Sequence, residues 1–131
     1  MYHFSVTIHG DFDEVVALAR TALADHGFGV LTEIDVAATL KAKLDVDRDR
    51  YLILGACNPP YAHQALEADP AIGVLLPCNV VVRQLEGDGV MVDFMNPEAV
   101  LHLVGKPGID RVAGEVRTRL EMVRDAIATA H

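Results

Sequence analysis

The chain has 131 residues, of which 51% are hydrophobic and 5% aromatic, and its formal net charge is −8. An acidic chain without tryptophan repels phosphate backbones and lacks the usual platforms for base stacking, so we expect no nucleic-acid partner. No apolar run approaches the ~18 residues that a membrane-spanning helix needs, so we expect no membrane partner. The chain opens without the basic and apolar pattern of a secretory signal, which predicts a cytoplasmic location and free thiols for its two cysteines.

The first part of the chain alternates between strand and helix patterns. Residues 3–8 alternate between apolar and polar side chains, as a half-buried strand does. Asp11, followed by Glu14 three residues later, is typical of a helix start, and Gly27 is a suitable stop. Residues 28–33 then predict a second strand.

The middle of the chain repeats this order. Asp35 could cap a short amphipathic helix, and residues 50–56 form the short apolar run of a central strand. Asn58 is a good N-cap residue, and Pro59 fits the first helical position because the N–H that it lacks would be unpaired there. We expect this helix to run to about Asp69.

The last part predicts a hairpin and a long helix. Residues 79–85 and 90–95 read as strands joined by a turn with two glycines, and residues 97–104 as one or two helical turns. The clearest element is a long C-terminal helix, whose apolar residues recur at steps of three and four. They are Ile109, Val112, Val116, Leu120, Val123 and Ile127.

Together these elements predict one α/β (α+β-like) domain spanning residues 1–131. We expect a mixed sheet of about five strands, covered by helices. The early strand–helix–strand order favours parallel neighbours, and the hairpin adds an antiparallel pair.

Two cysteines are the best candidates for a site. Cys57 leaves a central strand just before a helix start, where unpaired N–H groups and the helix dipole favour a thiolate. Cys78 follows a proline at the start of the next apolar run, and either thiol could equally be a small buried hydrophobe. If their strands run parallel, the thiols lie at opposite sheet ends, beyond the ~7 Å limit for a disulfide; if antiparallel, they share one end.

The spacing of cysteines and histidines supports no metal site. The chain contains neither H-x-x-x-H nor C-x-x-C. The loosest combination joins Cys57 and Cys78 with His63 or His102, soft ligands that suit copper(I) or zinc. A surface position is the preferred interpretation for His63, so we predict no metal, and any cofactor stays unknown.

The segments around the two cysteines resemble one known family. Residues 57–62 read Cys-Asn-Pro-Pro-Tyr-Ala, and residues 75–82 read Leu-Leu-Pro-Cys-Asn-Val-Val-Val. Together they resemble the bacterial and archaeal family called domain of unknown function 302, and the resemblance covers nearly the whole chain. It implies a compact α/β fold that forms homodimers, and it supplies no reaction. The residues that match the family are Asn58, Pro59, Ala62, Pro77 and Cys78.

Three hypotheses about function follow. The leading one is a homodimeric domain that binds a small ligand or ion near the Asn58-Pro59 helix start, where helix N–H groups face the ligand and Cys78 lines the pocket. The second is a thiol-based redox enzyme or sensor with Cys78 as nucleophile and Cys57 as its resolving partner. The third is a structural interaction module in which both thiols are core. Whether the protein is an enzyme stays open.

Overall fold

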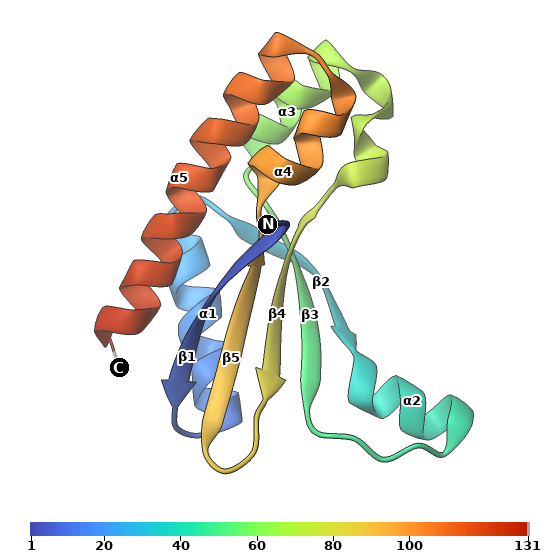
Figure 1. Ribbon diagram of the computed structural model, residues 1–131, viewed down its shortest axis with the longest axis vertical. Coiled ribbons are helices and arrows are strands. Elements are labelled where there is room, and N and C mark those ends of the chain that lie inside the picture. Colours follow the sequence, from blue (N-terminus) through green and yellow to red (C-terminus); the bar gives the residue numbers. More distant parts are fainter. Residues whose placement is uncertain (131) are drawn as a thin grey trace.

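The computed structural model describes residues 1–130, and its centre is a five-stranded sheet (Figure 1). The strands lie in the order β1-β5-β4-β3-β2, and all four neighbouring pairs are antiparallel. Their bounds are β1 His3–His9, β2 Gly29–Asp35, β3 Tyr51–Cys57, β4 Cys78–Gln84 and β5 Gly89–Met95.

Helices connect the strands and cover the sheet. The α-helices are α1 Phe12–Asp25, α2 Val36–Leu44, α3 Pro59–Ala68, α4 Pro97–Leu101 and α5 Pro107–Ala130. Two short 3₁₀ helices complete the described chain, η1 Pro70–Leu75 and η2 His102–Val104. The predicted α/β class, five strands and long C-terminal helix are confirmed, whereas η1 was not predicted. None of the helices within residues 1–130 is both long and apolar enough to cross a membrane.

The prediction of parallel neighbours in a mixed sheet is wrong, because every pair is antiparallel. β1 and β2 do run in the same direction, as the β1-α1-β2 order predicts, but they lie at opposite edges of the sheet. The other three strands fill the space between them. A local pattern indicates the relative direction of two strands; it does not indicate which later strands will separate them.

The expected helix starts are present. The Asp11 side chain accepts a hydrogen bond from the Glu14 N–H at 3.1 Å, and the Asp35 side chain accepts one from the Ala38 N–H at 2.9 Å. Such caps pair N–H groups that have no partner within the helix.

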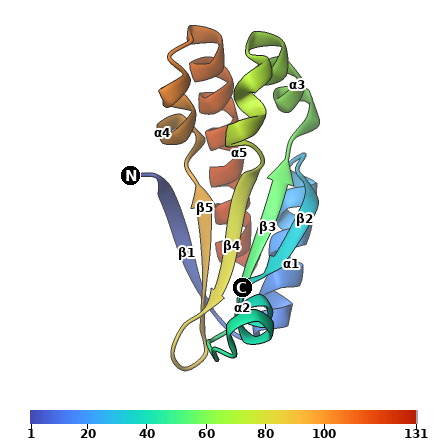
Figure 2. The same cartoon turned by 90° about the vertical axis from the view of Figure 1, so that its right-hand side faces the viewer.

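The core lies on one face of the sheet, beneath α1 and α5 (Figure 2). Alternate residues of the central strands point into this core, and the predicted apolar stripe of α5 packs onto them. The strand residues with the most complete burial are Leu54, Ala56, Val80, Val82, Val90, Val92 and Phe94. Within residues 1–130, no helix covers the opposite face of the sheet (Figure 2).

Gly55 is required by a close approach at this uncovered face. The backbone of β3 is so near its neighbours that a Cβ added at Gly55 would collide with the Thr32 hydroxyl and lie 2.9 Å from the Pro77 ring. A glycine inside a strand often marks such an approach. The missing side chain therefore allows β2 and the residue just before β4 to approach the backbone of β3 closely.

We predict that Gly55→Ala lowers the free energy of unfolding by about 1–3 kcal/mol, the usual cost of overpacking. Thr32→Ala in the same chain should recover part of the loss, because it removes one of the two colliding groups. Gly29→Ala is the matched control, since nothing lies within 4 Å of its added Cβ. Urea denaturation of the four proteins measures the effect, and equal losses in the two glycine variants would contradict it.

Candidate functional site

An apolar cavity of about 300 Å³ lies at the end of the sheet where α3 and α4 pack. Its wall combines the ends of β3 and β4 with residues of β2, α3, η1, α4 and α5. The lining residues are Phe28, Leu31, Ala56, Cys57, Asn58, Tyr61, Ala62, Ala65, Leu66, Gly73, Leu76, Pro77, Cys78, Leu101, Val112 and Val116. Leu31 and Leu66 are exposed, so the cavity reaches the surface on their side.

The antiparallel pairing of β3 with β4 brings both cysteines to this cavity. Ala56 lies opposite Cys78 in the register, and Cys57 is the next residue of β3. The two thiols thus share one end of the sheet, the second of the two arrangements that the sequence left open. Both are free thiols, with Cys78 buried and Cys57 half-buried.

Burial makes both thiols poor nucleophiles. Desolvation raises the pKa of Cys78 from 9.0 to about 12, and the neighbouring Cys57 contributes to the same shift. The pKa of Cys57 is also raised by burial. Reactive cysteines need the opposite shift, because the thiolate is the attacking species.

Asn58 is buried and caps α3, as predicted from the sequence. Its side chain accepts a hydrogen bond from the Tyr61 N–H at 3.4 Å, and its carbonyl accepts one from the Ala62 N–H at 2.9 Å. Pro59 and Pro60 have no N–H, so the first turn of α3 has no donor left for a ligand. The expectation that N–H groups of this helix face an anion is therefore wrong.

Pro59 has a structural position at the helix start. It is exposed and does not line the cavity, whereas Asn58 and Cys78 do. Of the three predicted ligand-binding residues, the structure thus brings two together.

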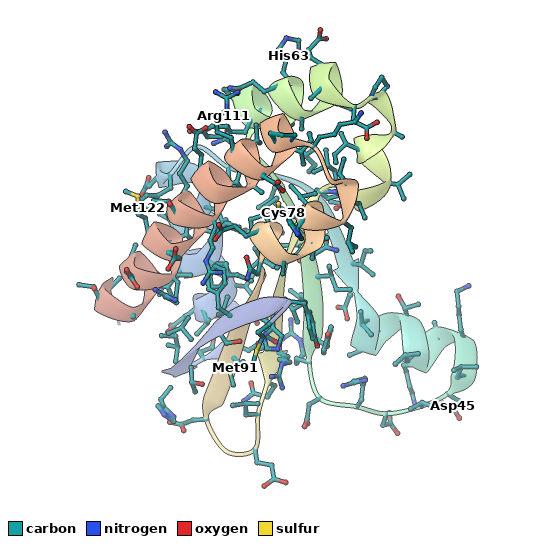
Figure 3. The ribbon with its side chains drawn as sticks, turned by 45° about the horizontal axis from the view of Figure 1, so that its top comes forward. Asp45, His63, Cys78, Met91, Arg111 and Met122 are labelled. Atoms are coloured by element: carbon teal, nitrogen blue, oxygen red, sulfur yellow. The ribbon has the colours of Figure 1, made fainter. Side chains whose placement is uncertain are left out.

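A second, charged groove lies on the other side of Asn58. Its volume is about 580 Å³, and its charged side chains come from α5. They are Arg111, Glu115 and Arg119, which follow one another at intervals of one turn, so the carboxylate lies between the two guanidinium groups. Figure 3 shows Arg111 at the outer side of α5 near α3.

The structure does not bring the histidines of the loosest metal combination to the thiols. His63 is exposed and points away from the molecule, whereas Cys78 lies inside it (Figure 3). His102 is also exposed, and its Nδ1 lies 3.4 Å from a carboxylate oxygen of Asp110. Within residues 1–130, no group of three His, Cys, Asp or Glu side chains could hold a metal ion.

Most of the residues that line the cavity were not predicted from the sequence. Leu101, Val112 and Val116 line the cavity from α4 and α5, although the sequence alone would place them simply in the core. The three-and-four spacing identified the apolar stripe of α5. It could not show that the upper part of the stripe faces a cavity, because that depends on where α3 and α4 pack.

These features define a small α/β domain with an antiparallel sheet and an apolar cavity at one sheet end. Residues 4–127 match the family model "Domain of unknown function DUF302", so the chain belongs to the DUF302 family. A similar solved structure is the uncharacterized conserved protein DUF302 from Bacillus stearothermophilus, with 27% sequence identity and a TM-score of 0.89. The match covers 97% of this chain and 98% of that one. No curated protein matches this chain.

We predict that iodoacetamide modifies Cys57 of the native protein at pH 8.5 at least about 100-fold faster than Cys78. The reason is that each unit of raised pKa lowers the thiolate fraction about tenfold, and burial also blocks access. Mass spectrometry of timed samples gives the two rates, and the unfolded protein, in which the rates should converge, is the control. Similar rates in the native protein would contradict the assignment of Cys78 to the buried wall.

Proposed function

We propose that the protein binds a small, neutral, apolar molecule in the cavity between α3 and the ends of β3 and β4. The observation that supports this proposal is the wall itself, in which the side chains are almost all apolar and the polar ones are Asn58, Tyr61 and two un-ionised thiols. A volume of about 300 Å³ is at the lower end of the range for ligand sites.

The polar groups at the wall favour a neutral ligand. The side-chain oxygen of Asn58 already accepts the Tyr61 N–H, and the N–H groups of the first turn of α3 are absent or paired. Burial holds Cys78 un-ionised, so no charge at the wall would attract an ion. An ion would lose its hydration there without compensation.

The same observations weigh against the redox hypothesis. A pair of cysteines that exchanges electrons needs an accessible thiolate and a partner sulfur within disulfide reach. Here the candidate nucleophile, Cys78, is the more deeply buried of the two thiols, and its pKa is raised. Binding is therefore the function that this geometry supports best.

The neutral fluorescent probe N-phenyl-1-naphthylamine tests the proposal. We expect saturable fluorescence enhancement in the wild-type protein, which contains no tryptophan to interfere. Ala62→Phe should fill the cavity from its half-buried position and weaken probe binding by about tenfold or more.

Ala68→Phe is the matched control for this experiment. It makes the same change at an exposed position of α3 outside the cavity, and it should leave the affinity unchanged. Circular dichroism checks that both variants fold. Unaltered affinity in Ala62→Phe would show that the probe binds elsewhere.

We also propose that the chain forms a homodimer through β2 and α2, and that it is located in the cytoplasm. The support for the interface is exposed apolar surface. β2 is an edge strand with Ile34 49% exposed, and α2 has no buried residue although it ends in Leu44, which is 67% exposed. Figure 1 shows α2 projecting beside the lower end of the sheet.

We predict a wild-type mass of two chains in light scattering after size exclusion, and a shift toward one chain in Leu44→Lys. A lysine there would have to lose its hydration in the interface, which we expect to raise the dissociation constant about tenfold or more. Val74→Lys is the control, because Val74 is 87% exposed and lies on η1, away from α2. A monomeric wild type, or an unchanged mass in Leu44→Lys, would contradict the proposed interface.

A further inference from the structure

The uncovered face of the sheet contains a hollow of about 530 Å³ that is separate from the apolar cavity. Its polar side chains come from the segments before β1 and before β3 and from four strands. They include Arg48, Tyr51, Arg83 and Asp93. Tyr51 lies opposite Arg83 in the register, and Asp93 lies opposite Val81, two residues before Arg83. Arg83 is therefore flanked on this face by an aromatic ring and a carboxylate.

Both oxygens of the Asp93 carboxylate in the hollow already accept hydrogen bonds. Arg83 donates from Nε to one oxygen of Asp93 at 2.7 Å, and the Ser5 hydroxyl donates to the other. The Asp93 side chain is only 16% exposed, and the hydrogen bond that it accepts raises the pKa of Arg83. A guanidinium has five N–H donors, and the terminal amino groups of Arg83 have no acceptor among the described residues.

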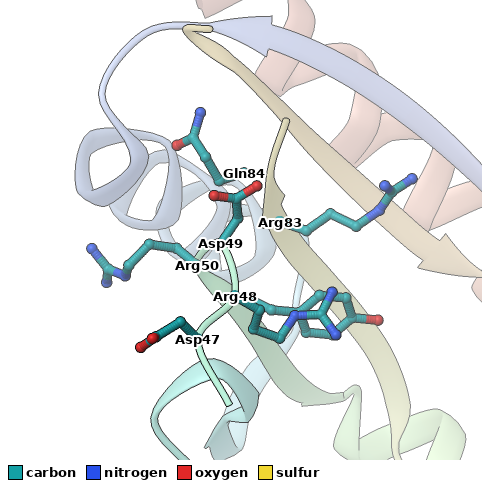
Figure 4. Close-up of a pocket in the computed structure, with 7 residues that line it drawn as sticks. Asp47, Arg48, Asp49, Arg50, Arg83 and Gln84 are labelled. Atoms are coloured by element: carbon teal, nitrogen blue, oxygen red, sulfur yellow. The ribbon is translucent and has the colours of Figure 1, made fainter. Parts of the chain in front are cut away.

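Arg48 supplies a second guanidinium. It forms no ion pair with any residue of the described chain, and its Cζ lies 5.2 Å from the centroid of the Tyr51 ring. Figure 4 shows Arg48 in the segment before β3 and Arg83 on the neighbouring strand β4. With His3, which also lines the hollow, counted as neutral, two arginines and one aspartate give it a formal charge of +1, in a chain whose formal net charge is −8.

We infer that this hollow binds a small organic carboxylate with a flat apolar body. The carboxylate would accept hydrogen bonds from Arg48 and from the terminal amino groups of Arg83, a pairing for which the planar guanidinium is well suited. The body would lie on Tyr51 and Val81, which line the same hollow. A single excess positive charge matches a monoanion better than a phosphate dianion.

Two other charged hollows differ from this one in how their carboxylates are held. The adjoining hollow in Figure 4 shares Arg48, Tyr51 and Arg83, but its wall also includes Asp47 and Asp49. In the groove between α3 and α5, the Glu115 carboxylate lies one turn from each arginine. Of these three hollows within residues 1–130, the one on the sheet face has its carboxylate bound by a lining arginine that keeps free N–H donors.

Titration with 2-naphthoate, followed by amide chemical shifts in NMR, tests the inference. We expect the largest shifts at Val81 and its neighbours on β4, and Arg48→Gln should weaken binding about fivefold or more. The neutral analogue 2-naphthylmethanol should bind about tenfold more weakly than the carboxylate, because it cannot pair with both guanidinium groups.

Arg119→Gln is the matched control. Arg119 lies over the Tyr61 ring at 5.4 Å, so the variant removes the same charge from a similar arginine–tyrosine pair outside the hollow. We expect unchanged naphthoate affinity in this variant. The inference is overturned if Arg119→Gln weakens binding as much as Arg48→Gln, if neither variant has an effect, or if the alcohol binds as well as the carboxylate. None of these readouts depends on the apolar cavity, so the failure of one site leaves the other testable.

Discussion

The antiparallel register between β3 and β4 positions everything else in this molecule. It places Ala56 opposite Cys78 on the helix-covered face and Tyr51 opposite Arg83 on the uncovered face. Because side chains alternate along a strand, a slip of one residue would send each set to the other face. The buried valines of β4 resist such a slip, since it would expose them to water. Hydrophobic burial thus fixes the geometry of both proposed sites.

The two faces create different chemistry from the same pair of strands. On the covered face, desolvation keeps Cys78 un-ionised and leaves the cavity to apolar contacts. On the uncovered face, the Asp93 carboxylate lies 2.7 Å from the Arg83 guanidinium, which is its partner. An unpaired charge has a large desolvation free energy in an apolar environment and a small one where water reaches it. The apolar and the anionic ligand that we propose would therefore bind on opposite sides of this sheet.

The sequence predicted the local structure well because local signals determine it. Asp11, Asp35 and Asn58 cap the helices expected of them, and the spacing of Ile109 to Ile127 defined α5. Sheet order was not predictable in this way, since it depends on contacts between segments distant in the chain. The Cys57 and Cys78 pair was identified from the sequence, but its shared cavity could only follow from the register. Arg48 and Arg83 gave no signal, because 35 positions of chain separate them and no motif joins them.

The absence of free backbone N–H donors at the start of α3 argues against an anion site at this helix end. Helix N-termini attract anions through unpaired N–H groups as well as through the dipole. In α3 two prolines remove donors, and Asn58 uses those of Tyr61 and Ala62. What remains is a well-capped helix whose first turn closes an apolar cavity. The two prolines thus leave no backbone N–H donor for a polar ligand at this helix start, and the anion site that we propose lies instead among side-chain donors on the open sheet face.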